Sequence, residues 1–169
     1  MQVSIRNKWI SLRGSSTVKD VNENDVLIVK GKFFTVTRKK FIQDLDGNTI
    51  YIVRNKFWRL FAYRAFVLDA DKNIIFRIRR KIFSFHDRYF CKSDLGEVEL
   101  KGNILGFDYH IYLNGEEIAH VSRKISLRDS FVLETLEDDK IDWRLLVAFV
   151  IAIDNITDQR QADASSSSY

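Results

Sequence analysis

Proline is absent from the 169-residue sequence, and cysteine occurs only once, as Cys91. The absence of proline excludes proline-rich linkers, collagen-like repeats and cis-proline turns. A single cysteine cannot form an intrachain disulfide or a zinc site by itself, so we expect the hydrophobic core to hold the fold together. The first eight residues also lack the apolar stretch of a signal peptide, which predicts a cytoplasmic location.

Hydrophobic residues make up 46% of the chain and charged residues 30%, which is a globular composition and fits one domain. The net charge of +4 conceals a division along the sequence. Residues 1–92 carry 20 basic and 8 acidic side chains, a net charge of +12, whereas residues 93–169 carry 7 and 15, a net charge of −8. If the two halves of the sequence occupy separate regions of the fold, this division predicts a basic surface for anionic partners. If they interleave, it predicts that basic and acidic side chains pair with each other.

A short phrase recurs about every two dozen residues: a lysine, once replaced by asparagine, is followed by a large apolar residue. Regular recurrence at this spacing indicates that the chain repeats one supersecondary unit, here six times over residues 1–135. The marker residues, at spacings of 24, 24, 25, 22 and 21, are Lys8, Lys32, Lys56, Lys81, Asn103 and Lys124.

Turn signals rich in aspartate, asparagine and glycine separate stretches of β-branched and aromatic residues. Leu45-Asp46-Gly47-Asn48 and Leu113-Asn114-Gly115-Glu116 are examples, and such residues supply the positive φ angles that hairpin turns need. The flanking stretches, such as 26–29, 50–53 and 109–112, are typical of strands. Each unit is therefore predicted to contain two strands, and the whole chain about twelve antiparallel strands.

Residues 145–153 form a run of nine apolar residues without a polar face. Asp142 is a suitable N-cap before the run and Asp154-Asn155 follows it, so we predict a helix over residues 142–155. Such a helix spans about 21 Å, short of the ~30 Å hydrocarbon core of a membrane, so we favour burial in protein. Residues 1–156 are then one domain, and residues 157–169 a disordered tail.

The predicted strands and the predicted helix fit each other. About twelve strands close into a barrel whose lumen is too wide for the strand side chains alone to fill. A helix that is apolar on all sides would fill that lumen. We therefore predict a mainly β fold, in which a closed antiparallel barrel of about twelve strands encloses a hydrophobic C-terminal α-helix.

Four features together carry a family resemblance: the repeated Leu-Asp turn, the Lys-aromatic step, the phrases Ser11-Leu12-Arg13 and Ser126-Leu127-Arg128, and the helix end Ile153-Asp154-Asn155. They resemble the LURP-one-related family, which is similar to the tubby C-terminal domain and the phospholipid scramblases. The resemblance covers residues 5–156 and implies a twelve-stranded barrel around a C-terminal helix. Tubby domains bind membrane phosphoinositides and scramblases act on phospholipids, but no headgroup-binding residues of tubby are carried over to positions in this sequence.

No arrangement of residues indicates catalysis, so we predict a protein that is not an enzyme and has no cofactor or metal. The segment 69–73 opens like a calcium loop, but Ile74 and Arg80 occupy the positions that need glycine and glutamate. Asp108 and His110 share a strand face and suit a carboxylate–imidazole pair, yet nothing nearby completes a catalytic set. We interpret Cys91 as a half-buried strand residue.

The candidate binding residues are basic. Alternation along residues 77–81 places three cations on one face, opposite Ile78, and an apolar lumen cannot hold all three, so we expect them to point outward. Other cations join them where neighbouring strands align; the alternative is an ordinary solvated exterior. The candidates for anion or lipid binding are Arg77, Arg79, Lys81, Arg54, Lys56, Arg38, Lys39 and Lys40.

We therefore predict a non-enzymatic binding module, peripheral at the membrane, that engages anionic phospholipid headgroups or another polyanion through a basic barrel surface. The alternative is a soluble protein-interaction scaffold without lipid contact, which predicts an exposed apolar patch or groove. Nucleic acid is a weaker candidate, because aromatic residues such as Trp9, Phe33 and Phe57 are more typical of barrel core than of base stacking.

Overall fold

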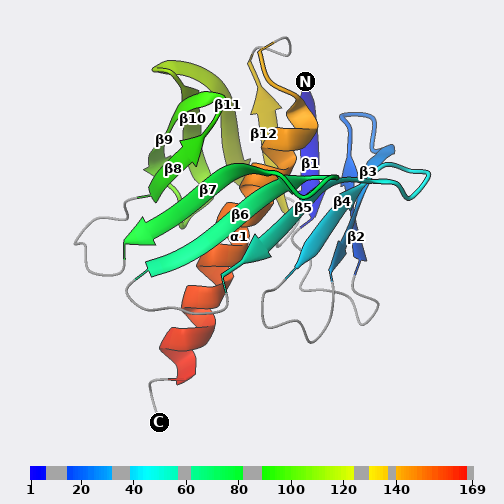
Figure 1. The fold of residues 1–169 in the computed structure, drawn as a ribbon. Coiled ribbons are helices and arrows are strands. Elements are labelled where there is room, and N and C mark those ends of the chain that lie inside the picture. The colour runs from blue at the N-terminus through cyan, green and yellow to red at the C-terminus, as the bar shows by residue number, and fades with distance from the viewer. Residues whose placement is uncertain are drawn as a thin grey trace.

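The computed structural model describes residues 1–6, 15–31, 39–56, 62–81, 89–123, 130–136 and 140–166. Twelve strands precede one helix in these ranges (Figure 1). They are β1 (Gln2–Arg6), β2 (Ser15–Lys19), β3 (Asp25–Gly31), β4 (Lys40–Gln43), β5 (Thr49–Asn55), β6 (Ala62–Asp69), β7 (Ile74–Lys81), β8 (Tyr89–Ser93), β9 (Gly96–Asn103), β10 (Asp108–Leu113), β11 (Glu116–Arg123), β12 (Ser130–Thr135) and α1 (Trp143–Ser166).

The strands form a closed antiparallel barrel in which each strand pairs with its neighbours in sequence, and β1 pairs with β12 to close it. The predicted fold is confirmed. Successive strands alternate in direction, so the hairpin turns that follow β2, β4, β6, β8 and β10 share one end of the barrel. We call this the turn end, and we call the opposite end, where the C-terminal part of α1 emerges, the exit end (Figure 1).

The sequence repeat corresponds to pairs of strands. Lys56 directly follows β5, Lys81 is the last residue of β7, and Asn103 is the last residue of β9. The marker therefore recurs where an odd-numbered strand reaches the exit end. Lys8, Lys32 and Lys124 lie outside the described residues.

Three hairpin turns at the turn end share one hydrogen-bonding pattern. In residues 20–24, 44–48 and 69–73, the carboxylate of the first residue accepts hydrogen bonds from the main-chain and side-chain amides of the asparagine four positions later. These bonds lower the pKa of all three aspartates. Segment 69–73 is thus a hairpin turn. The fourth residue of each turn has a positive φ: Glu23 63°, Gly47 89° and Lys72 72°.

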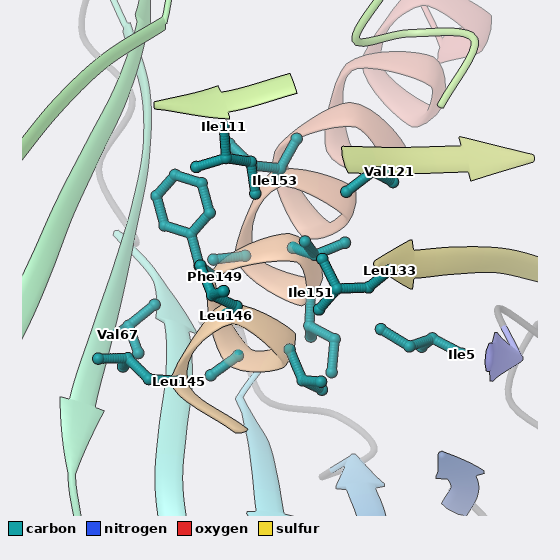
Figure 2. Close-up of a cluster of buried hydrophobic side chains, with 14 of the residues drawn as sticks. Ile5, Val67, Ile111, Val121, Leu133, Leu145, Leu146, Phe149, Ile151 and Ile153 are labelled. Carbon is teal, nitrogen blue, oxygen red and sulfur yellow. The ribbon is translucent and has the colours of Figure 1, made fainter. Parts of the chain in front are cut away.

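The helix fills the lumen, and every residue from 145 to 157 is buried. Figure 2 shows side chains from strands around the barrel, among them Ile5, Val67 and Leu133, gathered about the helix. Phe149 meets the Phe76 ring edge-on, with their centroids 5.0 Å apart. A helix without a polar face is stable here because the barrel wall removes all of its sides from water.

Asp142 caps the helix as predicted. Its carboxylate accepts hydrogen bonds from the main-chain amide of Arg144 at 2.9 Å, from the Arg144 guanidinium at 3.0 Å and from the Tyr51 hydroxyl at 2.9 Å. Burial opposes ionisation of Asp142, but these bonds outweigh it and lower the pKa of the carboxyl group. Burial, together with this carboxylate, raises the pKa of Tyr51 to about 12.

We expect Asp142→Ala to lower the free energy of unfolding by about 1 kcal/mol at neutral pH, because the cap is lost. Since the pKa is lower in the folded state, this contribution is present above the ordinary aspartate pKa and disappears as the pH falls through the lowered value. The penalty should therefore shrink towards ~pH 2 in urea unfolding. Asp142→Asn, which keeps a capping oxygen, is the control; an equal loss in both variants would contradict the capping role.

The helix ends eleven residues later than the sequence analysis predicts, at Ser166 instead of Asn155. Residues 157–166, for which a disordered tail is predicted, continue α1. The prediction places the boundary where the apolar run stops, but the following glutamine, arginine and alanine residues favour helix, and neither proline nor glycine interrupts them. Thr157 is still buried and its hydroxyl donates a hydrogen bond to the Ile153 carbonyl at 3.1 Å.

Candidate functional site

Strand β7 carries the predicted cations on its outer side. Arg77 and Arg79 are exposed, whereas Phe76 and Ile78 are each 1% exposed and face the core. The expected alternation is therefore observed for these residues. Lys81 ends β7, but its side chain lies outside the description.

Strand pairing gathers further outward side chains beside these two arginines. Arg77 lies opposite Phe66 of β6 and Lys92 of β8, and Phe66 lies opposite Arg54 of β5. Because adjacent strands are about 4.8 Å apart, such residues form continuous rows across the wall. Two rows on β5–β8 make what we call the basic grid: Lys56, Arg64, Arg79 and Phe90 in the first, nearer the exit end, and Arg54, Phe66, Arg77 and Lys92 in the second.

Two arginines of the basic grid lie over aromatic rings. The guanidinium carbon of Arg54 is 5.2 Å from the centroid of the Phe66 ring, and that of Arg79 is 5.1 Å from the centroid of Phe90. A guanidinium stacked on a ring keeps its charge and its N–H edge for an anion, while its orientation is restricted. The rings therefore restrict the orientation of these two cations without neutralising them.

The basic grid has six cations and no acid. Among the described residues, no carboxylate forms an ion pair with Arg54, Arg77 or Arg79, and the first acidic residue along the rows is Glu97, opposite Lys92. Arg64 and Arg79 even lie directly opposite each other, a like-charge pair that destabilises a sheet.

The inner side of the same strands rests on the helix. Val53, Ala65 and Val67 alternate with the grid residues and are completely buried. The helix contacts β5, β6 and β7, which are three of the four strands that carry the basic grid. The cations therefore project from a wall that is packed from behind, and their main chain is held in place.

Lys40 does not join the grid. Its amino group lies 3.6 Å from the Asp154 carboxylate of α1, and only 3% of the Asp154 side chain is exposed. Near the exit end the helix is no longer apolar, and the Asn55 amide donates a hydrogen bond to the Asn155 carbonyl at 3.4 Å. Lys40 lies opposite the buried Val53, faces the interior and pairs there with a buried carboxylate, so it supports the fold.

Lys39 immediately precedes β4, where Lys40 pairs with Val53, so Lys39 lies at the Arg54 end of the second row. Its amino group is 5.3 Å from the centroid of the Phe41 ring, on β4. Arg80, which is not among the predicted binding residues, faces inward and is 5% exposed, since alternation turns every second side chain to the lumen. Arg38 lies outside the described residues, as do Trp9, Phe33 and Phe57.

Two of the three histidines, His110 and His120, form a separate array on the outer side of β10 and β11, and His86 lies outside the described residues. His110 Nδ1 is 2.7 Å from Glu117, His120 Nε2 is 3.2 Å from Asp108, and the two imidazoles stack with centroids 4.4 Å apart. The hydrogen bond from His110 lowers the pKa of Glu117. Asp108 thus pairs with His120 and not with His110, because the cross-strand register places the two imidazoles side by side.

Within the described residues, no three histidine, cysteine, aspartate or glutamate side chains are arranged to bind a metal ion. Cys91 is half-buried, as interpreted, and burial raises the pKa of its thiol to about 12. The thiolate, which is the nucleophilic form, is therefore scarce at neutral pH.

The architecture defines a class of protein: a twelve-stranded antiparallel barrel built around one hydrophobic helix. The family model for LURP-one-related proteins matches residues 1–154, and the chain belongs to this family, as the sequence predicts. An X-ray structure of a protein from Arabidopsis thaliana is similar, with a TM-score of 0.59 and 17% sequence identity over 92% of this chain and 91% of that one. That likeness concerns the fold alone. No curated protein matches the chain.

Among the helical residues that the structure describes, no segment is both long enough and apolar enough to cross a membrane.

Proposed function

We propose that the protein is a non-enzymatic binding module, peripheral at the cytoplasmic side of a membrane, whose basic grid engages anionic phospholipid headgroups or another polyanion. The family and the barrel fold are consistent with a binding module. The observation that carries the proposal is the grid itself, in which six cations occupy two adjacent rows of four strands without an interposed acid.

The topology supports the proposal by separating the two halves of the sequence. Every strand pairs with its sequence neighbours, so the strands within residues 1–92 form one continuous arc of the wall. This is the half with a net charge of +12. The halves therefore do not interleave around the barrel, and the basic arc presents a field that attracts anions.

The available energy is sufficient for reversible attachment. A lysine or arginine close to an anionic membrane surface contributes about 1 kcal/mol. Six such residues account for at most ~6 kcal/mol, which corresponds to roughly 10⁴-fold enrichment. Attachment of this kind weakens as salt screens the charges.

Arg64→Glu tests the proposal without weakening the fold. The new carboxylate faces Arg79 directly, so it replaces a repulsive cross-strand pair by an attractive one and should raise the free energy of unfolding by up to ~1 kcal/mol. Charge reversal should nevertheless reduce binding by about thirtyfold, or ~2 kcal/mol. Co-sedimentation with phosphatidylcholine vesicles, with and without about 30% phosphatidylserine, at ~0.15 M salt measures the binding.

Arg123→Glu is the matched control, since it makes the same charge change at an exposed position on β11, away from the grid. It should retain most of the binding. Equal pelleting of the wild-type protein with neutral and anionic vesicles would contradict binding to anionic lipid. Protein partners that are still captured by the Arg64→Glu variant in a pull-down would instead favour the protein-interaction scaffold.

A further inference from the structure

We infer that the basic grid is seated against a bilayer, with the Phe90 ring entering the interfacial layer of the membrane while the surrounding cations contact headgroups. This inference rests on the proposed function and narrows it, because it assigns the anion to a lipid surface and not to a soluble polyanion. It also predicts an orientation, with the β7–β8 wall towards the membrane.

Phe90 is the apolar side chain that the grid leaves open to solvent. It is 43% exposed, although Arg79 lies over one part of the ring. By contrast, Ile52 and Leu68, the next outward residues of β5 and β6 beyond the second row, are each only 5% exposed. Phe90 is thus the last residue of the first row, next to Arg79.

The combination of one open aromatic ring with flanking cations suits a membrane interface. Phenylalanine gains free energy when its ring leaves water for the boundary between headgroups and acyl chains, and arginine and lysine meet the anionic headgroups at the same depth. The long stems of these cations cover apolar surface while their charges stay at the polar level.

The shape of the surface points the same way. The grid lies on the outside of a closed barrel, where the wall is convex around the barrel axis. A small soluble anion is held best by donors that converge in a concave site. An extended anionic surface can contact both rows of a convex wall at once, and the four-strand width of the grid matches such a contact.

Phe90→Ala is the test, with vesicles that contain about 30% phosphatidylserine at ~0.15 M and ~0.5 M salt. Wild-type protein should keep part of its binding at the higher salt, because the aromatic contribution is not screened. Phe90→Ala should bind about fivefold more weakly at the lower salt and lose the residual binding at the higher salt. Leu45→Ala, at a 58% exposed position on the turn end, is the control and should behave as wild type.

Phe90→Trp provides a second readout that does not depend on affinity. Its fluorescence should shift to the blue on addition of vesicles and be quenched by brominated lipid beyond the wild-type background, whereas Leu45→Trp should show neither change. If Phe90→Ala pellets like wild type at both salt concentrations while Arg64→Glu still loses binding, the proposed function stands and the insertion of Phe90 is wrong. If wild-type protein does not bind vesicles but shifts a single-stranded oligonucleotide, the seating on a bilayer is wrong and the proposed function holds for another polyanion. If it binds neither, both are wrong.

Discussion

Val150→Asp is expected to abolish soluble folded protein. Val150 is completely buried within the segment 145–157 of α1, with the barrel wall around the helix. A carboxylate at this position must either remain ionised in an apolar core or take up a proton, and each state costs several kcal/mol. The total stability of a domain is only about 5–15 kcal/mol, so this one substitution removes a large part of it.

The yield of soluble protein and its melting temperature measure the effect. Leu136→Asp makes the same kind of change at a residue that is 52% exposed, and it should alter stability by no more than about 0.5 kcal/mol. A Val150→Asp protein that melted like wild type would show that the helix does not occupy the lumen.

Gly102→Ala should destabilise the barrel by at least ~3 kcal/mol, the second largest effect that we expect from a single substitution. Gly102 of β9 has a φ of +123°, which side chains rarely adopt. An added Cβ would lie 2.6 Å from the carbonyl oxygen of Asp108 and 2.9 Å from Cα of Tyr109. Both atoms belong to the main chain of β10, so relief requires that two strands move apart.

Gly115→Ala separates backbone strain from this collision. Gly115 also has a positive φ, +84°, but an added Cβ there meets nothing within 4 Å. Its cost should stay near 1 kcal/mol, the usual penalty of a left-handed conformation for alanine. Chemical denaturation of the two variants gives the difference, and equal costs would show that the close approach of β9 and β10 contributes little.

Most of the fold follows from signals that are local in the sequence. The turn at residues 44–48 can be recognised from its aspartates, Gly47 and asparagine, and similar turns recur at a regular interval. The strand count and the filled lumen then follow from the repeat and from the apolar run at 145–153. The end of α1 does not, because the prediction used the end of the apolar run, whereas helix propensity continues beyond it.

The sequence predicts the candidate surface only where the alternation along a single strand is enough to orient the side chains. Alternation along β7 places Arg77 and Arg79 outside without knowledge of any neighbour. Arg64 and Lys92 were missed because their membership depends on pairing across strands. The tight turn at 69–73 brings β6 and β7 together, but a register shift between Val67 and Leu68 is also needed to place Arg64 opposite Arg79. Alternation also places Lys40 on the inward face of β4 with Ile42, but its pairing with Asp154, 114 positions away, is a contact that no local pattern reveals.

The order of the elements along the chain has a consequence for biosynthesis. All twelve strands precede α1, so the ribosome releases the wall of the barrel before its core exists. The closing pair, β1 with β12, must also wait for nearly the whole chain. Nascent hairpins with exposed apolar faces are prone to aggregate. We therefore expect folding to be slow and largely post-translational, and to need chaperones until the helix has been synthesised.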